Sequence, residues 1–550
     1  MNFEDILQEA GSFGKFQIFM LFLLCLPRFI LPFHFLLHNF LAAIPSHHCA
    51  IPHQEQFANL TEEEVLLINI PRDFEGAFSS CEMFSEPQFH LLLNATQEPA
   101  NTSSVQSCQH GWVYDQSQFT STVATQWDLV CEQRSLNQAT ATFFFIGVTI
   151  GAVIFGYLSD RFGRKIMLLV SFVCTLIFGL VSSASVTYSM LAVTRTLTGM
   201  AICGLSLIVV PLGMEWVDIQ HRSVSGVLTS VFWSFGNMFL ALIAYLVRDW
   251  RWLLLAVTLP CVLGIISLWW VSESARWFLT KGKLKQAHKH LQRCAKMNGQ
   301  NDFGAKINLE ILSKTAAAAA ARAKSRGDSS YVSLFRTLML RRISLCMGAL
   351  WFGVAFSYYG MSMNITGFGL GMYMTQFVFG VIEIPAKLIV LIAVNRIGRK
   401  QCQAWSLILA GLCIGANIVI PTSLGTLRSV VAITGKGFSE AAFTMVFLYT
   451  PELYPTVLRQ KGLGYCSFVA RLGGSVAPLI FLLDTVWKLL PQVTYCAMAV
   501  LCGSVAFLLP ETLNVRLPET IEDIEKQSSE GKQQPPGDVF EVMPLHSLQK

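Results

Sequence analysis

The sequence contains twelve apolar stretches, each about as long as a helix that crosses a lipid bilayer. A spanning helix needs about 20 predominantly apolar residues, because the hydrocarbon core offers no water to pair with backbone polar groups. Of the 550 residues, 53% are hydrophobic and only 14% are charged, whereas soluble proteins carry about 25% charged residues. We therefore expect a polytopic membrane protein with spans at residues 16–43, 139–158, 166–186, 190–213, 224–247, 252–271, 343–363, 373–394, 403–422, 428–450, 461–483 and 491–510.

Two long polar segments interrupt this series and divide the spans into two groups of six. They are residues 44–137, after the first span, and residues 272–342, after the sixth. We expect an all-α membrane protein built from two six-helix bundles. Its parts are an N-terminus 1–15, a first bundle 16–271 that includes the loop 44–137, a polar segment 272–342, a second bundle 343–510 and a mostly disordered tail 511–550.

Charge and glycosylation motifs both predict which side of the membrane each segment occupies. Residues 272–342 contain 15 Lys and Arg against 4 Asp and Glu, whereas residues 44–137 contain 2 against 12. Because positive residues are retained in the cytoplasm, we expect residues 272–342 and both termini inside, although Arg248 and Arg251 oppose this assignment. Acceptor motifs for N-glycosylation, which require an outside location, begin at Asn59, Asn94, Asn101 and Asn364.

Four of the fifteen cysteines lie in the outer loop, where an oxidising compartment allows two disulfides. They are Cys49, Cys81, Cys108 and Cys131. Four cysteines allow three pairings, and of these we expect Cys49–Cys108 with Cys81–Cys131. The other eleven lie in spans or in residues 272–342, where we expect them to pack without a further role.

The polar segment 272–342 is strongly basic and contains a run of six alanines at residues 316–321. We expect short amphipathic helices that lie on the inner membrane surface, held by basic side chains near anionic lipid. A solvated basic linker is the alternative.

A motif between the second and third spans recurs in weaker form between the eighth and ninth. Its two copies are residues 156–165 and 395–400, and repetition at corresponding positions indicates two similar bundles. We expect the glycines to allow a tight turn, and the charges to latch the cytoplasmic helix ends until the two halves rock. A plain basic loop is the alternative. The latch candidates are Gly156, Asp160, Arg161, Gly163, Arg164, Arg396, Gly398 and Arg399.

The first copy of this motif resembles the signature of the major facilitator superfamily, and further segments resemble its organic anion transporter branch. Residues 272–279 are similar to the family segment after the sixth helix, with Ser272 in place of the usual proline, and residues 452–460 to the organic ion transporter signature. The resemblance covers essentially the whole chain and implies the major facilitator fold of two pseudo-symmetric six-helix bundles. It adds Glu215, Arg222, Glu452 and Arg459 to the latch candidates.

The resemblance also implies a function, with small organic anions as the cargo. It implies polyspecific, sodium-independent transport at the plasma membrane, basolateral in epithelial cells, by alternating access. Cargo of that branch includes prostaglandins, cyclic nucleotides, urate-like and orotate-like anions and drugs, exchanged against an intracellular anion such as a dicarboxylate. No phosphate-binding loop for ATP is present in the sequence.

Other classes of function receive little support. We expect no enzyme, because no nucleophile–base or metal-ligand spacing rises above chance, and so no cofactor and no metal. A net charge of +5 without a basic domain gives no reason to expect a nucleic-acid partner. Two alternatives remain open: an organic cation or zwitterion carrier of the same fold, and a non-transporting membrane receptor or assembly partner.

Ionisable residues inside spans are costly and therefore point to function. Glu383 and Lys387 are four residues apart, as are Lys436 and Glu440, so we expect each pair to neutralise itself along its own helix. Arg471 has no acidic residue within a helical turn. Because a guanidinium is always charged and matches the geometry of a carboxylate, Arg471 is the leading candidate for binding an anion.

The resemblance supports this choice and extends the candidate site. Anion carriers of the family have Arg at the position of Arg471, where cation carriers have Asp. They also have a functional Lys at the position of Lys387. For both residues, a purely structural ion pair is the alternative. Arg28 and Asn39 lie eleven residues apart in the first span, on nearly one helical face. The remaining substrate candidates are Ser467, Phe232, Trp233, Tyr358, Tyr359, Phe443 and Phe447, the rings providing rigid apolar surface.

Overall fold

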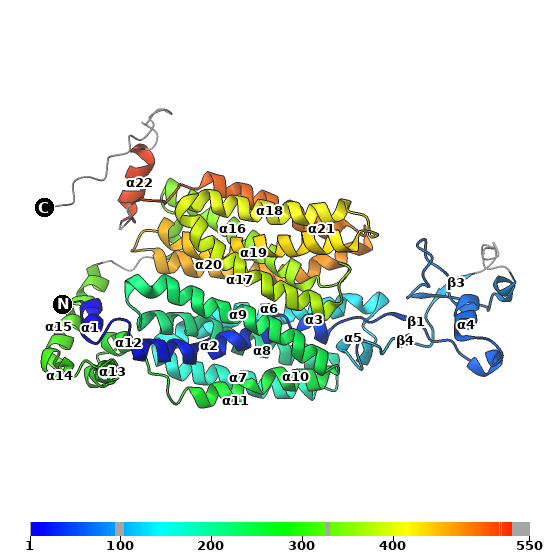
Figure 1. Ribbon diagram of the computed structural model, residues 1–550, viewed down its shortest axis with the longest axis horizontal. Coiled ribbons are helices and arrows are strands. Elements are labelled where there is room, and N and C mark those ends of the chain that lie inside the picture. Colours follow the sequence, from blue (N-terminus) through cyan, green and yellow to red (C-terminus); the bar gives the residue numbers. More distant parts are fainter. Residues whose placement is uncertain (1, 94–103, 326–329, 516, 519, 531–550) are drawn as a thin grey trace.

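The two groups of six spans form two helical bundles that lie side by side along one long axis (Figure 1). The computed structural model describes residues 2–93, 104–325, 330–515, 517–518 and 520–530. Within these residues, twelve helical spans are long and apolar enough to cross a membrane. The all-α prediction and the division into six plus six are thereby confirmed.

The observed spans match the predicted ones to within a few residues at most ends. The first bundle contains α2 (Lys15–Phe35) with α3 (His38–Leu41), α6 (Arg134–Phe162), α7 (Arg164–Ser183), α8 (Tyr188–Glu215), α9 (Arg222–Leu246), and α10 (Trp250–Thr258) with α11 (Pro260–Ser267). The second contains α16 (Leu338–Met363), α17 (Met372–Arg396), α18 (Arg399–Val419), α19 (Gly425–Leu453), α20 (Arg459–Ile480) and α21 (Leu490–Val505).

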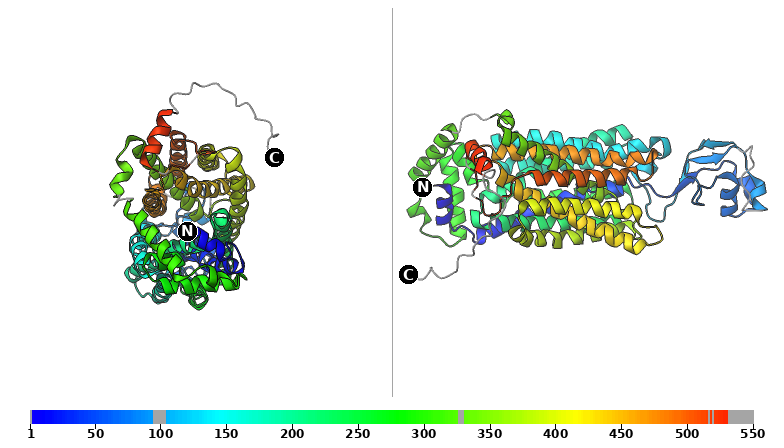
Figure 2. Two further views of the ribbon diagram at one scale, coloured as in Figure 1. Left: turned by 90° about the vertical axis from the view of Figure 1, so that its left-hand side faces the viewer. Right: turned by 90° about the horizontal axis from the view of Figure 1, so that it is seen from above.

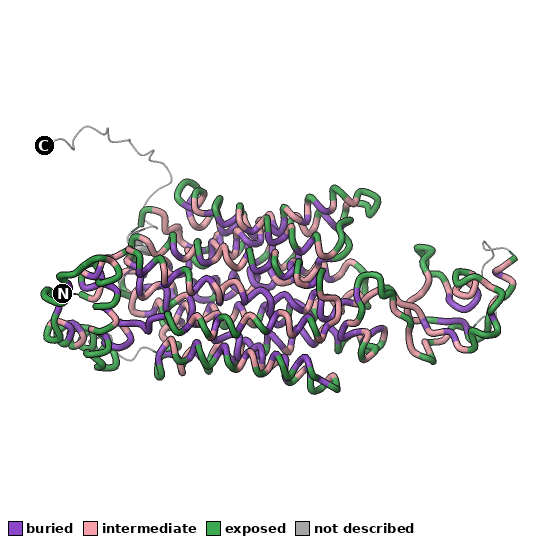
Figure 3. The backbone as a smooth tube through the Cα atoms, turned by 60° about the horizontal axis from the view of Figure 1, so that its bottom comes forward, coloured by how far each residue is buried: buried purple, intermediate pink, exposed green. Residues whose placement is uncertain are grey.

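Two spans that the hydropathy predicts as continuous are interrupted. The first breaks between Phe35 and His38, and the sixth breaks at Leu259, immediately before Pro260. A proline inside a helix removes one backbone hydrogen bond and crowds the preceding turn, which accounts for the break in the sixth span at that point. Hydropathy cannot detect such breaks, because the residues on both sides are equally apolar. Burial follows the bundle interiors, while the outer helix faces stay exposed (Figure 3).

The loop 44–137 projects from one end of the bundles as a small domain of its own (Figures 1 and 2). We call this end the disulfide end. The strands of this domain form two short antiparallel pairs, in which His48 lies opposite Val113 and Met83 lies opposite Gln106. Its elements are β1 (His47–Cys49), β2 (Glu82–Phe84), β3 (Val105–Ser107), β4 (Trp112–Tyr114), α4 (Glu62–Asn69) and α5 (Val123–Gln126).

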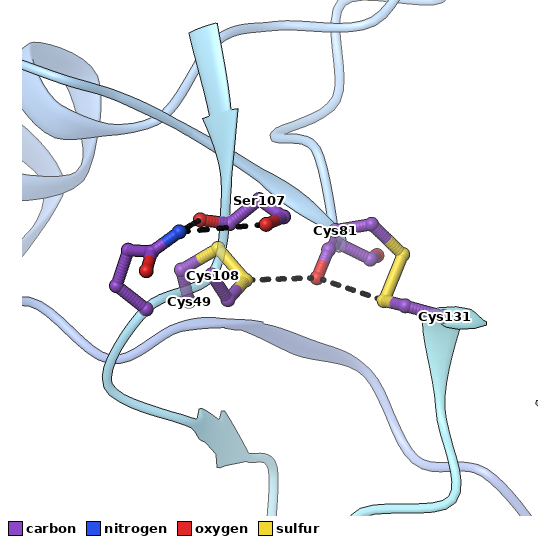
Figure 4. Close-up of a disulfide and its surroundings, with 7 residues drawn as sticks. Cys49, Cys81, Ser107, Cys108 and Cys131 are labelled. Carbon is purple, nitrogen blue, oxygen red and sulfur yellow. Dashed lines mark hydrogen bonds between the residues drawn. A yellow bond between two sulfur atoms is a disulfide. The ribbon is translucent and has the colours of Figure 1, made fainter. Parts of the chain in front are cut away.

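Two disulfides cross-link this domain in the predicted pairing (Figure 4). Cys49 is bonded to Cys108 with the Cα atoms 5.1 Å apart, and Cys81 to Cys131 with the Cα atoms 5.7 Å apart. The buried apolar core of the domain is small, so the bridges supply the covalent cross-links that small outer domains use. The disulfide prediction is therefore confirmed.

The two described glycosylation motifs differ in exposure, and this predicts which one carries a glycan. Asn59 is exposed, whereas Asn364 is half-buried and is followed by Ile365, which is only 2% exposed. Asn94 and Asn101 lie outside the described residues. We expect Asn59→Gln to migrate faster on a denaturing gel, and Asn364→Gln to migrate like the wild type. Enzymatic deglycosylation of each sample is the control, and a shift for Asn364→Gln would contradict the prediction.

The segment 272–342 lies at the opposite end of the bundles, which we call the basic end (Figures 1 and 2). It contains the predicted short helices: α12 (Ala275–Thr280), α13 (Leu284–Met297), α14 (Phe303–Lys306) and α15 (Leu309–Ser325). The N-terminal α1 (Phe3–Glu9) packs against them, with Ile6 and Leu7 fully buried. Glu4 of α1 forms ion pairs with Arg222 at 2.9 Å and Arg276 at 2.7 Å.

The prediction of a mostly disordered tail is wrong for its first part. Residues 521–530 form a helix, α22 (Ile521–Glu530), which packs on α16 through the buried Ile524. A Glu525 carboxylate oxygen also accepts a hydrogen bond from the backbone N–H of Met339. The polar composition of the tail did not indicate this helix, because a helix that packs through one narrow apolar face contains few apolar residues. Residues 531–550 lie outside the described part of the chain.

Candidate transport site

The charged residues of α17 and α19 pair between the helices and not along them. Lys436 Nζ lies 3.1 Å from Glu383, and Lys387 Nζ lies 3.5 Å from Glu440. The predicted pairing of residues four apart on one helix is therefore wrong. An ion pair within one helix would involve only that helix. The two crossed pairs instead connect α17 to α19.

These pairs are tied to the first bundle through α9. Lys387 Nζ donates to the Ser230 carbonyl at 2.8 Å and to Ser234 Oγ at 3.0 Å. Glu383 accepts from Ser234 Oγ at 3.0 Å, and from the Tyr358 hydroxyl at 2.8 Å. Glu383 and Lys436 are fully buried, so protein groups must stabilise their charges: Glu383 also accepts from Asn237 at 3.4 Å, and Lys436 donates to Ser362 and lies over the Tyr358 ring. The network thus connects the two halves of the protein near the middle of α9 and α17.

Two arginines face this region from opposite bundles without an ion-pair partner among the described residues. Arg471 of α20 donates to the Ser467 carbonyl at 3.1 Å and to Ser467 Oγ, and Cys203 of α8 also interacts with its guanidinium. Arg28 of α2 is close enough to Glu440 to interact electrostatically, but forms no ion pair with it. The Nε atoms of both arginines are buried without a hydrogen-bond partner.

The balance of charge at this level of the membrane is positive. Arg28, Lys387, Lys436 and Arg471 contribute four positive charges, and Glu383 and Glu440 contribute two negative charges. The difference of 4 − 2 leaves two positive charges in a region of low dielectric constant. A buried charge without compensation is unfavourable, so the arrangement favours the entry of an anion.

Most of the predicted aromatic residues gather around these charges. Trp233 Nε1 donates to the Tyr358 hydroxyl at 3.1 Å, and Tyr358 lies 5.2 Å from Phe443 between ring centroids. Phe443 in turn contacts Phe447, which is 55% exposed. The exception is Phe232, whose ring packs against Phe235 on its own helix.

Tyr359 connects the arginines with the aromatic residues of both halves. Its ring lies 4.8 Å from that of Phe145 on α6 and 5.3 Å from that of Tyr358. It also interacts electrostatically with both Arg471 and Arg28. Tyr359 therefore lies between the two arginines, and Trp233, Tyr358 and Phe443 adjoin it in a chain of ring and hydrogen-bond contacts.

The predicted substrate residue Asn39 instead holds the two bundles together towards the disulfide end. Its amide nitrogen donates to the Ser362 carbonyl at 2.8 Å and to Gln376 Oε1 at 3.0 Å. Nearer that end, Arg134 pairs with Asp484 at 2.5 Å. Among the described residues, the hydrogen bond between the bundles that lies closest to the basic end is the one from Lys387 to Ser230. The halves are therefore closed at the disulfide end.

At the basic end, the two copies of the repeated motif adopt matching structures. Arg164 pairs with Asp160 at 2.6 Å and with Glu215 at 3.5 Å, and Arg399 pairs with Glu452 at 3.1 Å. These arginines begin α7 and α18, directly after the turn that the motif forms. The structure thus brings the main charged latch candidates together within each bundle.

Other latch candidates lie apart from these pairs. Arg222 contacts Glu4 and the Val217 carbonyl, not Glu215, and Arg459 donates to the Tyr454 carbonyl at 3.5 Å. Arg161 and Arg396 are exposed, and Gly156 faces open space.

Two glutamates that the sequence analysis did not select complete the turns. Glu273 accepts from the backbone N–H groups of Arg164 at 3.1 Å and Lys165 at 2.9 Å. Glu511 accepts in the same way from those of Arg399 at 2.9 Å and Lys400 at 3.1 Å. A carboxylate at a helix N-terminus accepts hydrogen bonds from the free N–H groups there and interacts favourably with the positive end of the helix dipole.

The glycines of the motif make room for these carboxylates. Gly163 and Gly398 have φ of +107° and +101°, and a Cβ atom would lie 2.6 Å from Glu273 and 2.7 Å from Glu511 respectively. A sequence signal for the glutamates existed. Residues 272–274, Ser-Glu-Ser, and residues 510–512, Pro-Glu-Thr, form a second internal repeat that follows the last span of each half.

Removing either carboxylate charge should destabilise the protein. Hydrogen bonds to charged groups contribute about 1.5–3 kcal/mol, so we expect Glu273→Gln and Glu511→Gln each to lose about 1–2 kcal/mol. The measurement is the thermal unfolding midpoint of the purified protein in detergent. Glu310→Gln, in an exposed pair with Lys314, is the matched control and should change little. Equal midpoints for Glu511→Gln and the control would contradict the role of Glu511.

Comparison with known proteins places the chain among transporters. Residues 89–523 match the family described as "Sugar (and other) transporter". Solute carrier family 22 member 7 from Sus scrofa is 51% identical over 559 residues, and the protein of that name from Homo sapiens is 50% identical over 564, each match covering 100% of both chains. Solute carrier family 22 member 6 from Danio rerio is 40% identical, covering 96% of this chain and 94% of the relative.

Solved structures show the same fold. The xylose transporter XylE from E. coli, in a partially occluded inward open conformation, has a TM-score of 0.56 at 15% identity, covering 90% of this chain and 99% of that chain. Its inward open conformation gives a TM-score of 0.54 at 19% identity, covering 73% and 91%. At these identities the likeness shows the fold alone, which is the major facilitator fold.

The family resemblance found in the sequence is confirmed by these matches. Within the organic anion transporter branch, the stretch from Phe143 to Arg164 and residues 248–252 resemble organic anion transporter 2, which is solute carrier family 22 member 7. The close relatives are transporters and not enzymes. The chain therefore belongs to solute carrier family 22, the organic ion transporters of the major facilitator superfamily.

Proposed function

We propose that this protein carries organic anions across the plasma membrane by exchange, with Arg471 as the main anion-binding residue. The observation that carries the proposal is the pair of arginines, Arg28 and Arg471, which face one aromatic-lined region from opposite bundles and have no ion-pair partner in the part of the chain that the structure describes. A cationic cargo would add to this uncompensated positive charge, whereas an anionic cargo neutralises it. The names of the relatives, solute carriers, support transport as the activity.

Each group near the site has a distinct role in this proposal. Arg471 binds the anionic head with its planar guanidinium, while Ser467 holds that guanidinium from one turn away. Arg28 provides the second positive charge from the first bundle. Tyr358, Tyr359, Phe443 and Phe447 hold the apolar body of the cargo, whose shape varies. Lys387 acts through its ion pair with Glu440 of α19, while its hydrogen bonds to Ser230 and Ser234 hold it against α9.

The orientation follows from the disulfides and the charge of the loops. The disulfide end lies outside the cell and the basic end lies in the cytoplasm, together with both termini, because Lys and Arg stay on the cytoplasmic side. The halves are closed outside, so this structure corresponds to a state that faces the cytoplasm. The helices of the basic end lie near anionic lipid. Exchange occurs when the bundles rock and open the disulfide end, with an intracellular dicarboxylate as the counter-anion.

Uptake into cells that express the protein tests the proposal. We expect saturable uptake of labelled salicylate, or of a labelled cyclic nucleotide with which the unlabelled nucleotide competes. Preloaded glutarate should stimulate this uptake, and replacement of sodium should leave it unchanged. Labelled tetraethylammonium, a cation, should not enter above the level of untransfected cells. Uptake of the cation in place of the anions would contradict the anion assignment. Absence of flux from surface-resident protein would contradict transport and support a receptor or an assembly partner.

A further inference from the structure

A cavity in the second bundle begins about one helical turn from the crossed ion pairs, on their disulfide-end side, and has a different chemistry from the transport site. It opens between α16, α17, α18, α19 and α21, and the atom-free space of the cavity together with the open solvent at its mouth is about 420 Å³. Its apolar lining includes the rings of Phe368, Phe379 and Tyr495 and the side chain of Ile414. Asn364, Asn417 and Gln492 also line it, so amides are its main polar groups.

These amides have hydrogen-bonding capacity that the protein does not use. Asn417 is only 6% exposed, yet its Oδ1 atom has no hydrogen-bond partner. The Oε1 atom of Gln492 is likewise buried without a partner. A buried acceptor without a donor costs free energy, so each of these positions favours a bound group that presents an O–H or N–H.

We propose that this cavity is a second binding site, which takes a small neutral amphiphile such as a phenol. Of the described residues that line the cavity, Tyr495 is the one with an ionisable side chain, and its hydroxyl already donates to the Ala477 carbonyl. A ligand therefore needs no charge, in contrast to the anionic cargo of the transport site. Its hydroxyl donates to Asn417 or Gln492, and its ring packs among Phe368, Phe379 and Ile414.

The cavity lies near the side of the molecule that closes the transport path. Asn364 follows the last residue of α16, Asn417 is near the end of α18 and Gln492 is near the start of α21, all towards the disulfide end. Phe368 and Phe379 belong to the same apolar cluster as Leu36 and Phe40 of the first bundle. A ligand that fixes these rings stabilises the closure at the disulfide end. We therefore expect the bound ligand to lower the maximal rate of anion uptake and to leave the apparent affinity for the anion unchanged, a consequence that rests on the proposed transport function.

Photolabelling of the purified, full-length protein tests the site without requiring transport. The probe is a phenol that carries a diazirine, and the labelled peptides are identified by mass spectrometry. We expect saturable labelling of the ends of α16, α18 and α21, suppressed by excess 4-propylphenol. Labelling confined to lipid-facing residues, or labelling that does not saturate, would overturn the proposal.

Variants of the lining separate this site from general partitioning of the probe. Asn417→Leu removes an acceptor and should weaken saturable labelling about tenfold, the value of a hydrogen bond to a buried group. Ala432→Phe, which fills the cavity from α19, should abolish it. Asn301→Leu, an exposed asparagine at the basic end, is the matched control. If both cavity variants label like this control, the cavity is not the binding site.

Uptake measurements then address the coupling separately. In cells, 4-propylphenol should lower the maximal rate of anion uptake in the wild type and have little effect on Ala432→Phe. If the photolabelling succeeds and uptake is unaffected, the site exists but is not coupled to closure. If no anion uptake is found at all, the proposed function fails while the photolabelling result still stands.

Discussion

Replacing Arg471 with Asp should abolish organic anion uptake while the protein still reaches the cell surface. The substitution removes the guanidinium that faces the aromatic residues and introduces a negative charge that repels the cargo. Because Arg471 is half-buried and forms no ion pair among the described residues, its loss leaves no buried carboxylate without a partner. We therefore expect a loss of at least about 100-fold in uptake, from a charged hydrogen bond worth about 1.5–3 kcal/mol plus the added repulsion.

Two companion variants make this prediction specific. Arg471→Lys keeps the charge but loses the planar, two-pronged geometry, so we expect an intermediate loss of about tenfold. Lys285→Asp makes a comparable charge change at an exposed position of α13 and should leave uptake within about twofold of the wild type. Surface biotinylation corrects every value for expression. Wild-type uptake by Arg471→Asp would show that the anion binds elsewhere.

Breaking one crossed ion pair should destabilise the protein more than removing both of its charges. Lys436→Met leaves Glu383 fully buried and without its ammonium partner, which costs about 3–5 kcal/mol. The double variant Lys436→Met with Glu383→Gln removes both charges and should recover much of that loss. The measurement is the thermal unfolding midpoint of the purified protein. Lys314→Met, in the exposed pair with Glu310, is the control and should cost less than about 1 kcal/mol.

A second double variant distinguishes the crossed pairing from pairing along each helix. Lys436→Met with Glu440→Gln removes two residues that are four apart on α19 and leaves Lys387 and Glu383, which do not pair with each other in this structure. We expect this variant to be less stable than Lys436→Met with Glu383→Gln. The reverse order of stability would contradict the crossed arrangement.

The positions of the spans could be predicted from the sequence because hydrophobic length alone indicates them. The positions of all twelve spans follow from runs of about 20 apolar residues, and the repeated motif at residues 156–165 and 395–400 indicates the two halves. The pairing of Cys49 with Cys108 was also predicted correctly. The spans depend on local composition, and the disulfides required only a choice among the three pairings that four cysteines allow.

The charge partners could not be predicted from spacing, since spacing describes only one helix. Glu383 and Lys387 are neighbours on α17, but the packing of α17 against α19 brings Lys436 closer to Glu383. The same limit concealed the role of Glu511, whose carboxylate reaches the start of α18 from the segment after α21. A four-residue spacing is therefore weak support for an ion pair wherever a second charged helix packs alongside.

Counterflow in proteoliposomes tests the central claim, that this protein exchanges organic anions at a site centred on Arg471. Purified protein is reconstituted into vesicles loaded with unlabelled glutarate, and the entry of external labelled salicylate is followed. We predict transient accumulation above equilibrium for the wild type and Lys285→Asp, and none for Arg471→Asp. Equal entry into vesicles that contain wild-type protein and vesicles without protein would contradict the claim.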